Sequence, residues 1–240
     1  MKRVIYYSIG LLLLLSGQAV SSTWDLMGTA RDPVTGDFIY REFHRVELNA
    51  DQSQTRVVEY RDQNNEVLVV KTLVSPTDRP YLPEIRWDDM AQSSLIEGRF
   101  DGGIYEQSIA RPNGNDVQRA RLDDVQNTVL DAGFDRYLQD RMPDILAQGS
   151  LSFDFLSLGA GRTYAITANL IEANDAQIRL NIAPSSALIR WFVDPIELVY
   201  DRESLALIRY TGITNFRREG SVVNAVIDYQ YSPEAIEDAS

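Results

Sequence analysis

The sequence contains no cysteine among its 240 residues. This absence excludes disulfide bonds, metal sites built on thiolates, iron–sulfur clusters and thiol catalysis. A chain without disulfides must be held together by its hydrophobic core alone. A chain of this length can bury one sizeable core, so we expect a single domain.

Histidine and basic residues are also scarce. The single histidine, His44, would have to serve any Ser-His-Asp site, and no G-x-S-x-G motif accompanies it. The 23 Lys and Arg residues are outnumbered by 35 Asp and Glu residues, which gives a net charge of −12. Nucleic acids and anionic membrane surfaces attract clustered Lys and Arg, so this acidity argues against both as partners.

Two pairs of neighbouring acids, Asp88-Asp89 and Asp123-Asp124, could suggest a site with two carboxylates. Neighbouring residues of a strand point to opposite faces, so neither pair is well placed to converge on one substrate. Neither pair has the spacing of a calcium loop. We therefore expect no metal ion, no cofactor and no enzymatic activity. A hydrolase built from distant carboxylates, or another enzyme of unusual type, stays open.

The chain has one long apolar run, and it lies at the N-terminus behind Lys2 and Arg3. The run is too short to cross a bilayer, and Ala19 and Ser21 supply small residues for a cleavage site. Residues 1–21 are therefore predicted to be a secretory signal peptide cut near Ser21. The mature protein would be periplasmic and would not span a membrane. Losing the two positive charges takes its net charge from −12 to −14.

Most of the remaining chain alternates apolar and polar residues with a period of two. The pattern is clearest in residues 176–182 and recurs in residues 163–170 and 223–231. Such runs predict strands with one face on a core and one in water, as in antiparallel sheets. Turn signals rich in Asn, Asp, Gly and Pro separate about a dozen of them. Residues 22–240 are thus predicted to form one mainly β domain, a single curled antiparallel meander (half-barrel or open barrel), with a frayed tail at residues 232–240.

One amphipathic helix interrupts this pattern. Its apolar stripe on a helical wheel consists of Leu130, Phe134, Tyr137, Leu138, Met142 and Ile145. Asp131 is the predicted N-cap and Gly149 the predicted stop, while Pro143 predicts a kink or a fresh helical turn. Such a helix is marginal by itself in water, so we expect its stripe to pack on the concave face of the sheet.

Between helix and sheet, the sequence allows either a solid core or a cavity. The residues predicted to contact a ligand in such a cavity are Phe134, Leu138, Met142 and Ile145. In a straight helix Arg141 would lie near the middle of the stripe, where a guanidinium needs an acidic partner or a ligand anion. Arg141 is therefore predicted to bind a ligand headgroup. Alternatively, the kink at Pro143 turns Arg141 outward, or Arg141 pairs with a carboxylate of the protein.

Four stretches together resemble an uncharacterised family of exported proteins from Gram-negative bacteria. They are Gly28–Glu42, Asp131–Asp135, Ser152–Leu156 and Asp194–Asp201. The resemblance covers most of the mature chain. The layout of a curled sheet around a helix is also similar, at the level of the fold, to periplasmic lipoprotein carriers of the Lol system and related lipid carriers. This likeness implies a lipid or lipoprotein ligand.

The leading hypothesis is a soluble periplasmic binding or carrier protein that holds an apolar or amphipathic ligand between sheet and helix. The alternative is a non-enzymatic interaction module of the cell envelope, which has a solid core and acts on an envelope protein. A filled interior would favour the alternative. Outer-membrane barrels also show alternating strands, but the mid-chain helix and the polar end at Ser240 argue against one.

Overall fold

A computed structural model describes residues 24–122, 125–131, 133–157, 162–185, 195–218 and 220–232. The predicted signal peptide, Asp123-Asp124 and all but the first residue of the predicted tail lie outside these ranges. Strands make up most of the described chain, so the protein is mainly β, as the alternation predicts.

Within these ranges fifteen strands join in one sheet, in the order β8-β7-β6-β5-β4-β3-β2-β1-β15-β14-β13-β12-β11-β10-β9. The first half consists of β1 (Leu26–Arg31), β2 (Phe38–Leu48), β3 (Gln54–Arg61), β4 (Val67–Ser75), β5 (Glu84–Asp89), β6 (Ser94–Asp101), β7 (Ile104–Arg111) and β8 (Gly114–Arg121). The second half consists of β9 (Thr128–Leu130), β10 (Ser150–Ser157), β11 (Arg162–Ala173), β12 (Gln177–Pro184), β13 (Ile196–Asp201), β14 (Leu207–Arg218) and β15 (Ser221–Tyr231). A short 3₁₀ turn, Val125–Asn127, precedes β9.

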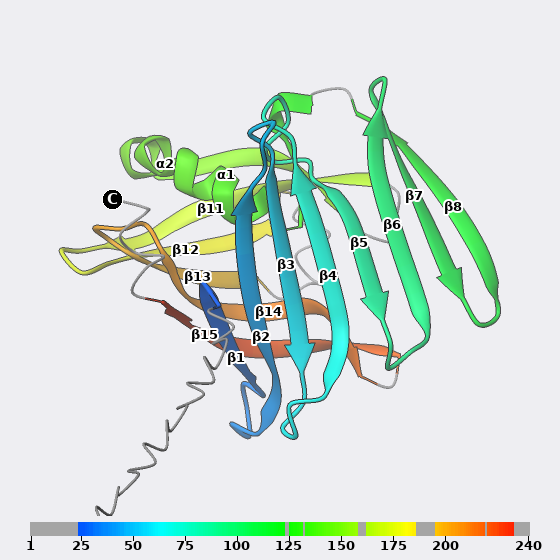
Figure 1. Cartoon of the computed structure of the whole chain (residues 1–240). Helices are drawn as coiled ribbons and strands as arrows, with labels where there is room; N and C mark the ends of the chain where they lie inside the picture. The colour runs from blue at the N-terminus through cyan, green and yellow to red at the C-terminus, as the bar shows by residue number, and fades with distance from the viewer. Residues whose placement is uncertain are drawn as a thin grey trace, which may run out of the picture.

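The sheet grows in both directions from its first strand. β1 pairs with β2 on one side and with the C-terminal strand β15 on the other, antiparallel in both cases. In Figure 1 the strands β2 to β8 stand upright, and β11 to β14 run crosswise behind them, so the sheet is strongly curled. In the described residues β8 and β9, at the two ends, do not pair with each other. The predicted curled, open sheet is confirmed.

One strand pair departs from the predicted antiparallel meander. β9 runs parallel to β10, with Thr128 opposite Asp154 and Leu130 opposite Leu156. Parallel neighbours cannot be joined by a hairpin and need a crossover, most often a helix. The helical segment between β9 and β10 is this crossover. Leu130, predicted to belong to the helix, lies in β9 instead.

Among the residues that the structure describes, two short helices replace the single predicted one. α1 (Gly133–Asp140) and α2 (Met142–Gln148) are separated at Arg141, and Pro143 lies in the first turn of α2. This is the fresh helical turn that the proline allows, since its missing N–H has no partner in a first turn. Gly149 ends α2 with a φ of 80°, a left-handed conformation that glycine adopts without steric cost.

The buried apolar residues of the described part of the chain form three clusters. One lies between the helices and the inner face of β9 to β13. A second fills the curl of β1 to β5 against β14 and β15. The third joins the two ends of the sheet, because Leu73 and Ile85 of the first half pack with Leu130 and Leu156 of the second. The curl therefore encloses a core that both halves share.

Candidate functional site

The residues predicted to contact a ligand lie in the core beneath the helices. Leu138, Met142 and Ile145 each expose 0% of their surface and pack against the inner face of β10 to β13. Phe134 is partly buried, and its ring centroid lies 5.8 Å from that of Phe153. The predicted stripe therefore packs on the concave face of the sheet, as expected. Whether these side chains also contact a ligand stays a prediction.

Arg141 does not share this environment. The break between α1 and α2 leaves its side chain 46% exposed, with Nη1 3.9 Å from Oδ2 of Asp144. Its guanidinium also lies 6.0 Å from the ring centroid of Tyr137. The outward orientation that the sequence allowed is the one observed. A headgroup bound by Arg141 would therefore lie outside the core and not within it.

The interior of the curl holds an ion pair that the sequence did not predict. Nζ of Lys71, on β4, lies 3.0 Å from Oδ2 of Asp131, and the two side chains expose only 9% and 6% of their surface. Asn215 of β14 donates a hydrogen bond of 2.8 Å to the other carboxylate oxygen. Asp131 was predicted to cap the helix. Asp131 directly follows β9, and its carboxylate instead contacts Lys71 of β4 and Asn215 of β14.

A second buried group lies nearby on β2. Glu42 and His44 occupy alternate positions of the strand and therefore face the same interior, with Nε2 of His44 3.6 Å from Oε1 of Glu42. Burial alone would raise the pKa of Glu42, but His44, Lys71 and Tyr229 lower it below its usual range. Burial lowers the pKa of His44, although Glu42 acts against this. An ionised Glu42 thus faces a neutral His44 at neutral pH.

Tyrosine side chains surround these groups. Burial and the nearby charge of Glu42 raise the pKa of the Tyr60 and Tyr229 hydroxyls well above its usual value, so both remain protonated. Gly28 makes room for the arrangement, since a Cβ there would lie 2.7 Å from Cγ of Glu42 and 2.8 Å from the ring of Tyr229. The interior of the curl therefore contains ionisable groups and tyrosine hydroxyls among its apolar residues.

Several of these polar atoms lack a hydrogen-bond partner within the described part of the chain. They are Oε1 of Glu42, both ring nitrogens of His44, the hydroxyl of Tyr105 and Nε2 of Gln107. Unpaired buried polar atoms are uncommon and are often satisfied by an ordered water or a ligand. These atoms are therefore the buried groups that an ordered water or a polar ligand would satisfy.

A signal for this cluster existed in the sequence. Lys71 interrupts the apolar positions of the β4 alternation, and Glu42 and His44 occupy inward positions of β2 beside Tyr40. Charged residues are seldom fully buried without a partner, so an inward lysine predicts an inward acid. The sequence does not show that this acid is Asp131, because Lys71 and Asp131 are far apart along the chain.

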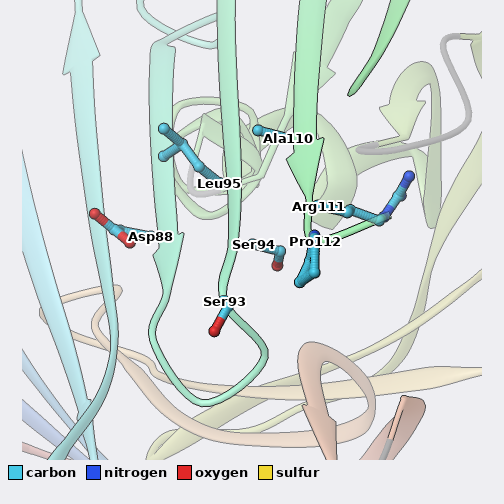
Figure 2. Close-up of a pocket in the computed structure, with 7 residues that line it drawn as sticks. All are labelled: Asp88, Ser93, Ser94, Leu95, Ala110, Arg111 and Pro112. Carbon is cyan, nitrogen blue, oxygen red and sulfur yellow. The ribbon is translucent and has the colours of Figure 1, made fainter. Parts of the chain in front are cut away.

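Two surface hollows lie away from the helix stripe. The larger, about 540 Å³, is an open groove on β5 to β7. Its lining residues, labelled in Figure 2, are Asp88, Ser93, Ser94, Leu95, Ala110, Arg111 and Pro112. The smaller, about 320 Å³, lies between the β2–β3 hairpin and α1 and is mainly polar. Neither hollow is lined by Phe134, Leu138, Met142 or Ile145.

Within the described residues, no helix is both long enough and apolar enough to cross a membrane. No family model matches the sequence, and no curated protein matches it either. The structure is similar to a crystal structure described as a beta-barrel-like protein of domain of unknown function DUF1849 from Brucella abortus. The two chains are 12% identical, with a TM-score of 0.51 over 86% of this chain and 96% of that one. At this identity the likeness shows a beta-barrel-like fold alone.

Proposed function

We propose that this chain is a non-enzymatic interaction module of the cell envelope, exported to the periplasm, with a filled core and an outer recognition surface. The packing of the helix stripe carries the proposal. Leu138, Met142 and Ile145 are completely buried against the sheet, which is the packing that a filled core beneath the helices requires. Binding would then depend on surface features such as the groove of Figure 2.

The groove suits contact with another protein better than enclosure of a small molecule. It is open, and Leu95 and Ala110 present apolar surface between polar and charged neighbours. Protein interfaces commonly combine an apolar centre with a polar rim. The strongly negative net charge of −12 also favours a partner with a basic surface, since complementary charge speeds encounter.

The first test is native mass spectrometry of the full chain after export, purified from the periplasm without detergent and followed by organic extraction. The expected result is a chain cut near Ser21 with no bound lipid and no uptake of added lipids. A lipid present at one molecule per chain would overturn the proposal in favour of a carrier. A chain that retains its first 21 residues in the cytoplasm would overturn the proposed export.

The second test detects a protein partner directly by photo-crosslinking. A photo-crosslinking amino acid at Leu95, in the groove, should yield one discrete adduct in living cells. The same amino acid at Thr29, on β1 away from the groove, is the matched control. Equal adducts from both positions, or none from any outward position of the sheet, would contradict a surface-binding module.

A carrier remains the second candidate, and one observation favours it. The unpaired buried atoms of Glu42 and His44 would be satisfied by the polar part of a molecule held inside the curl. Such a ligand would lie beside the tyrosines of β2, β3 and β15 and not beneath the helices. Native mass spectrometry distinguishes this carrier from an interaction module. A polar ligand bound there should be lost in His44→Phe but retained in the surface control Arg99→Gln.

A further inference from the structure

The smaller hollow has a composition unlike the rest of this acidic protein. It lies between the β2–β3 hairpin and the exposed face of α1, both at the upper end of the molecule in Figure 1. Its lining residues are Leu48, Gln52, Gln54, Arg56, Arg136, Gln139 and Asp140. We call this site the arginine hollow. It contains two arginines and one acid, in a chain whose net charge is −12.

The acid of the arginine hollow does not neutralise both arginines. Nε of Arg136 lies 3.8 Å from Oδ2 of Asp140, which is a loose ion pair between half-exposed side chains. The same carboxylate oxygen accepts a hydrogen bond of 2.9 Å from the hydroxyl of Tyr81. Asp140 is therefore shared, and the guanidinium of Arg136 keeps donors available to a ligand.

Arg56 is the more unusual of the two arginines. It is partly buried on β3, and it makes no side-chain hydrogen bond or ion pair with any residue in the described ranges. Its charge acts on Asp135, yet the pKa of Asp135 is raised by burial, and the carboxyl group accepts a hydrogen bond of 3.1 Å from Tyr200. Within the described residues no ion pair joins Arg56 to this carboxyl group, so the guanidinium keeps N–H donors that a ligand anion could accept from.

Carboxamides complete the arginine hollow. The side chains of Gln52 and Gln54 have no hydrogen-bond partner among the residues that the structure places. Gln139 donates hydrogen bonds of 3.1 Å to the carbonyl oxygen of Leu205 and of 3.5 Å to Oδ2 of Asp135, so both of its amide N–H groups are engaged within the protein. The guanidinium groups of the two arginines and the side-chain amides of Gln52 and Gln54 supply the donors that carboxylate and phosphate oxygens require.

We propose that the arginine hollow binds an oxyanion, a carboxylate or phosphate group carried by a small polar ligand, between Arg56 and Arg136. The approach of Arg56 from the hairpin and Arg136 from the helix allows charge-assisted hydrogen bonds from two sides. This inference goes beyond the proposed function, because the site would bind the same group in an interaction module or in a carrier.

The experiment is an NMR titration of the mature chain with succinate and, separately, with glycerol phosphate at low salt. The expected result is a saturable shift of the amide signals of residues 52–56 and 136–140 at millimolar ligand. Saturation with succinate alone identifies a carboxylate site, and saturation with glycerol phosphate alone identifies a phosphate site. Added salt should weaken the binding because the interaction is electrostatic.

Arg136→Gln is the main variant, because an exposed helix position can lose its charge without disturbing the core. It should weaken binding about tenfold or more. Arg56→Gln should weaken binding to a similar extent. If Arg56→Gln also lowers the stability of the fold, the test of the proposal rests on Arg136→Gln. The matched control is Arg99→Gln on β6, which removes one exposed positive charge elsewhere. No saturation with either ligand, or equal weakening by the control, would overturn the proposal.

Discussion

The ammonium group of Lys71 and the carboxylate of Asp131 meet at 3.0 Å inside the curl of the sheet. Lys71 lies in the middle of β4, whereas Asp131 follows β9 at the far end of the strand order. Asn215 extends this contact to β14. The pair thus links regions of the sheet that are joined by neither backbone ladder nor hairpin, and it helps to hold the curl closed around its core.

Replacing Lys71 with methionine should destabilise the fold by about 3–5 kcal/mol, because it leaves the Asp131 charge buried without its partner. The measurement is urea unfolding followed by tryptophan fluorescence. Adding Asp131→Asn to Lys71→Met should recover part of the loss, since the uncompensated charge is then gone.

The control for this pair is Arg86→Gln on the outer surface. Arg86 pairs there with Glu97, and both side chains are about half exposed. An exposed pair contributes little, so we expect a change below about 1 kcal/mol. If Lys71→Met cost no more than Arg86→Gln, the interior pair would not contribute to the stability of the curl.

Leu138 and Arg141 should differ sharply despite their closeness in sequence. Leu138→Ala removes a completely buried side chain and should cost about 2–5 kcal/mol. Arg141→Gln alters an exposed side chain with a weak contact and should stay within about 0.5 kcal/mol. Thermal unfolding of both variants checks this, and comparable losses would mean that Arg141 has a structural contact beyond Asp144.

The strands were readable from the sequence because a period of two records which face is buried. Residues 176–182 predict a strand with an apolar even face, and in β12 Ile178, Leu180 and Ile182 are indeed buried. The helix stop at Gly149 was also readable, since few other residues adopt its left-handed conformation. Local patterns therefore recovered the strands, their inner faces and one helix end.

Features that depend on distant partners were not readable. The parallel pairing of β9 with β10 depends on where a three-residue strand finds its neighbour, and three residues carry no usable period. The ion pair of Lys71 and Asp131 likewise joins two segments through the tertiary structure alone. The sequence left the orientation of Arg141 open, because a proline indicates a break but not its resulting direction.

The burial of His44 leads us to expect that the fold loses stability in mild acid. Burial lowers its pKa from a usual value near 6.5, so the unfolded chain takes up a proton before the folded one. The free energy of unfolding should therefore decrease as the pH falls below about 6.5. The lowered pKa of Glu42 removes stability only at lower pH, below its usual value of 4.5.

The comparison for this pH effect is His44→Gln, which should show a flatter dependence between about pH 7 and pH 5. Asp135 contributes with the opposite sign, because its raised pKa makes the folded state lose stability as the pH rises through its titration. Asp135→Asn removes that contribution and should steepen the decline toward acid. Parallel pH curves for wild type and His44→Gln would show that His44 is not the responsible group.

Gly133 should resist replacement even though alanine is the better helix former. A Cβ at this first residue of α1 would overlap the backbone carbonyl of Tyr81. That carbonyl cannot easily move, because it accepts a hydrogen bond of 2.9 Å from the amide of Leu130 in β9. Gly133→Ala should therefore lose about 1–3 kcal/mol of stability despite a gain of about 1 kcal/mol in helix propensity.

The control is Gly149→Ala, where no atom lies within 4 Å of the added Cβ and only the left-handed φ of 80° opposes the change. That variant should lose about 1 kcal/mol. Hydrogen exchange separates the two causes. Exchange of the Leu130 amide should accelerate well beyond the global change in Gly133→Ala, because its acceptor has been displaced, but only in proportion to stability in Gly149→Ala. Unchanged relative protection of Leu130 in both would mean that α1 shifts away from Tyr81 and leaves β9 in place.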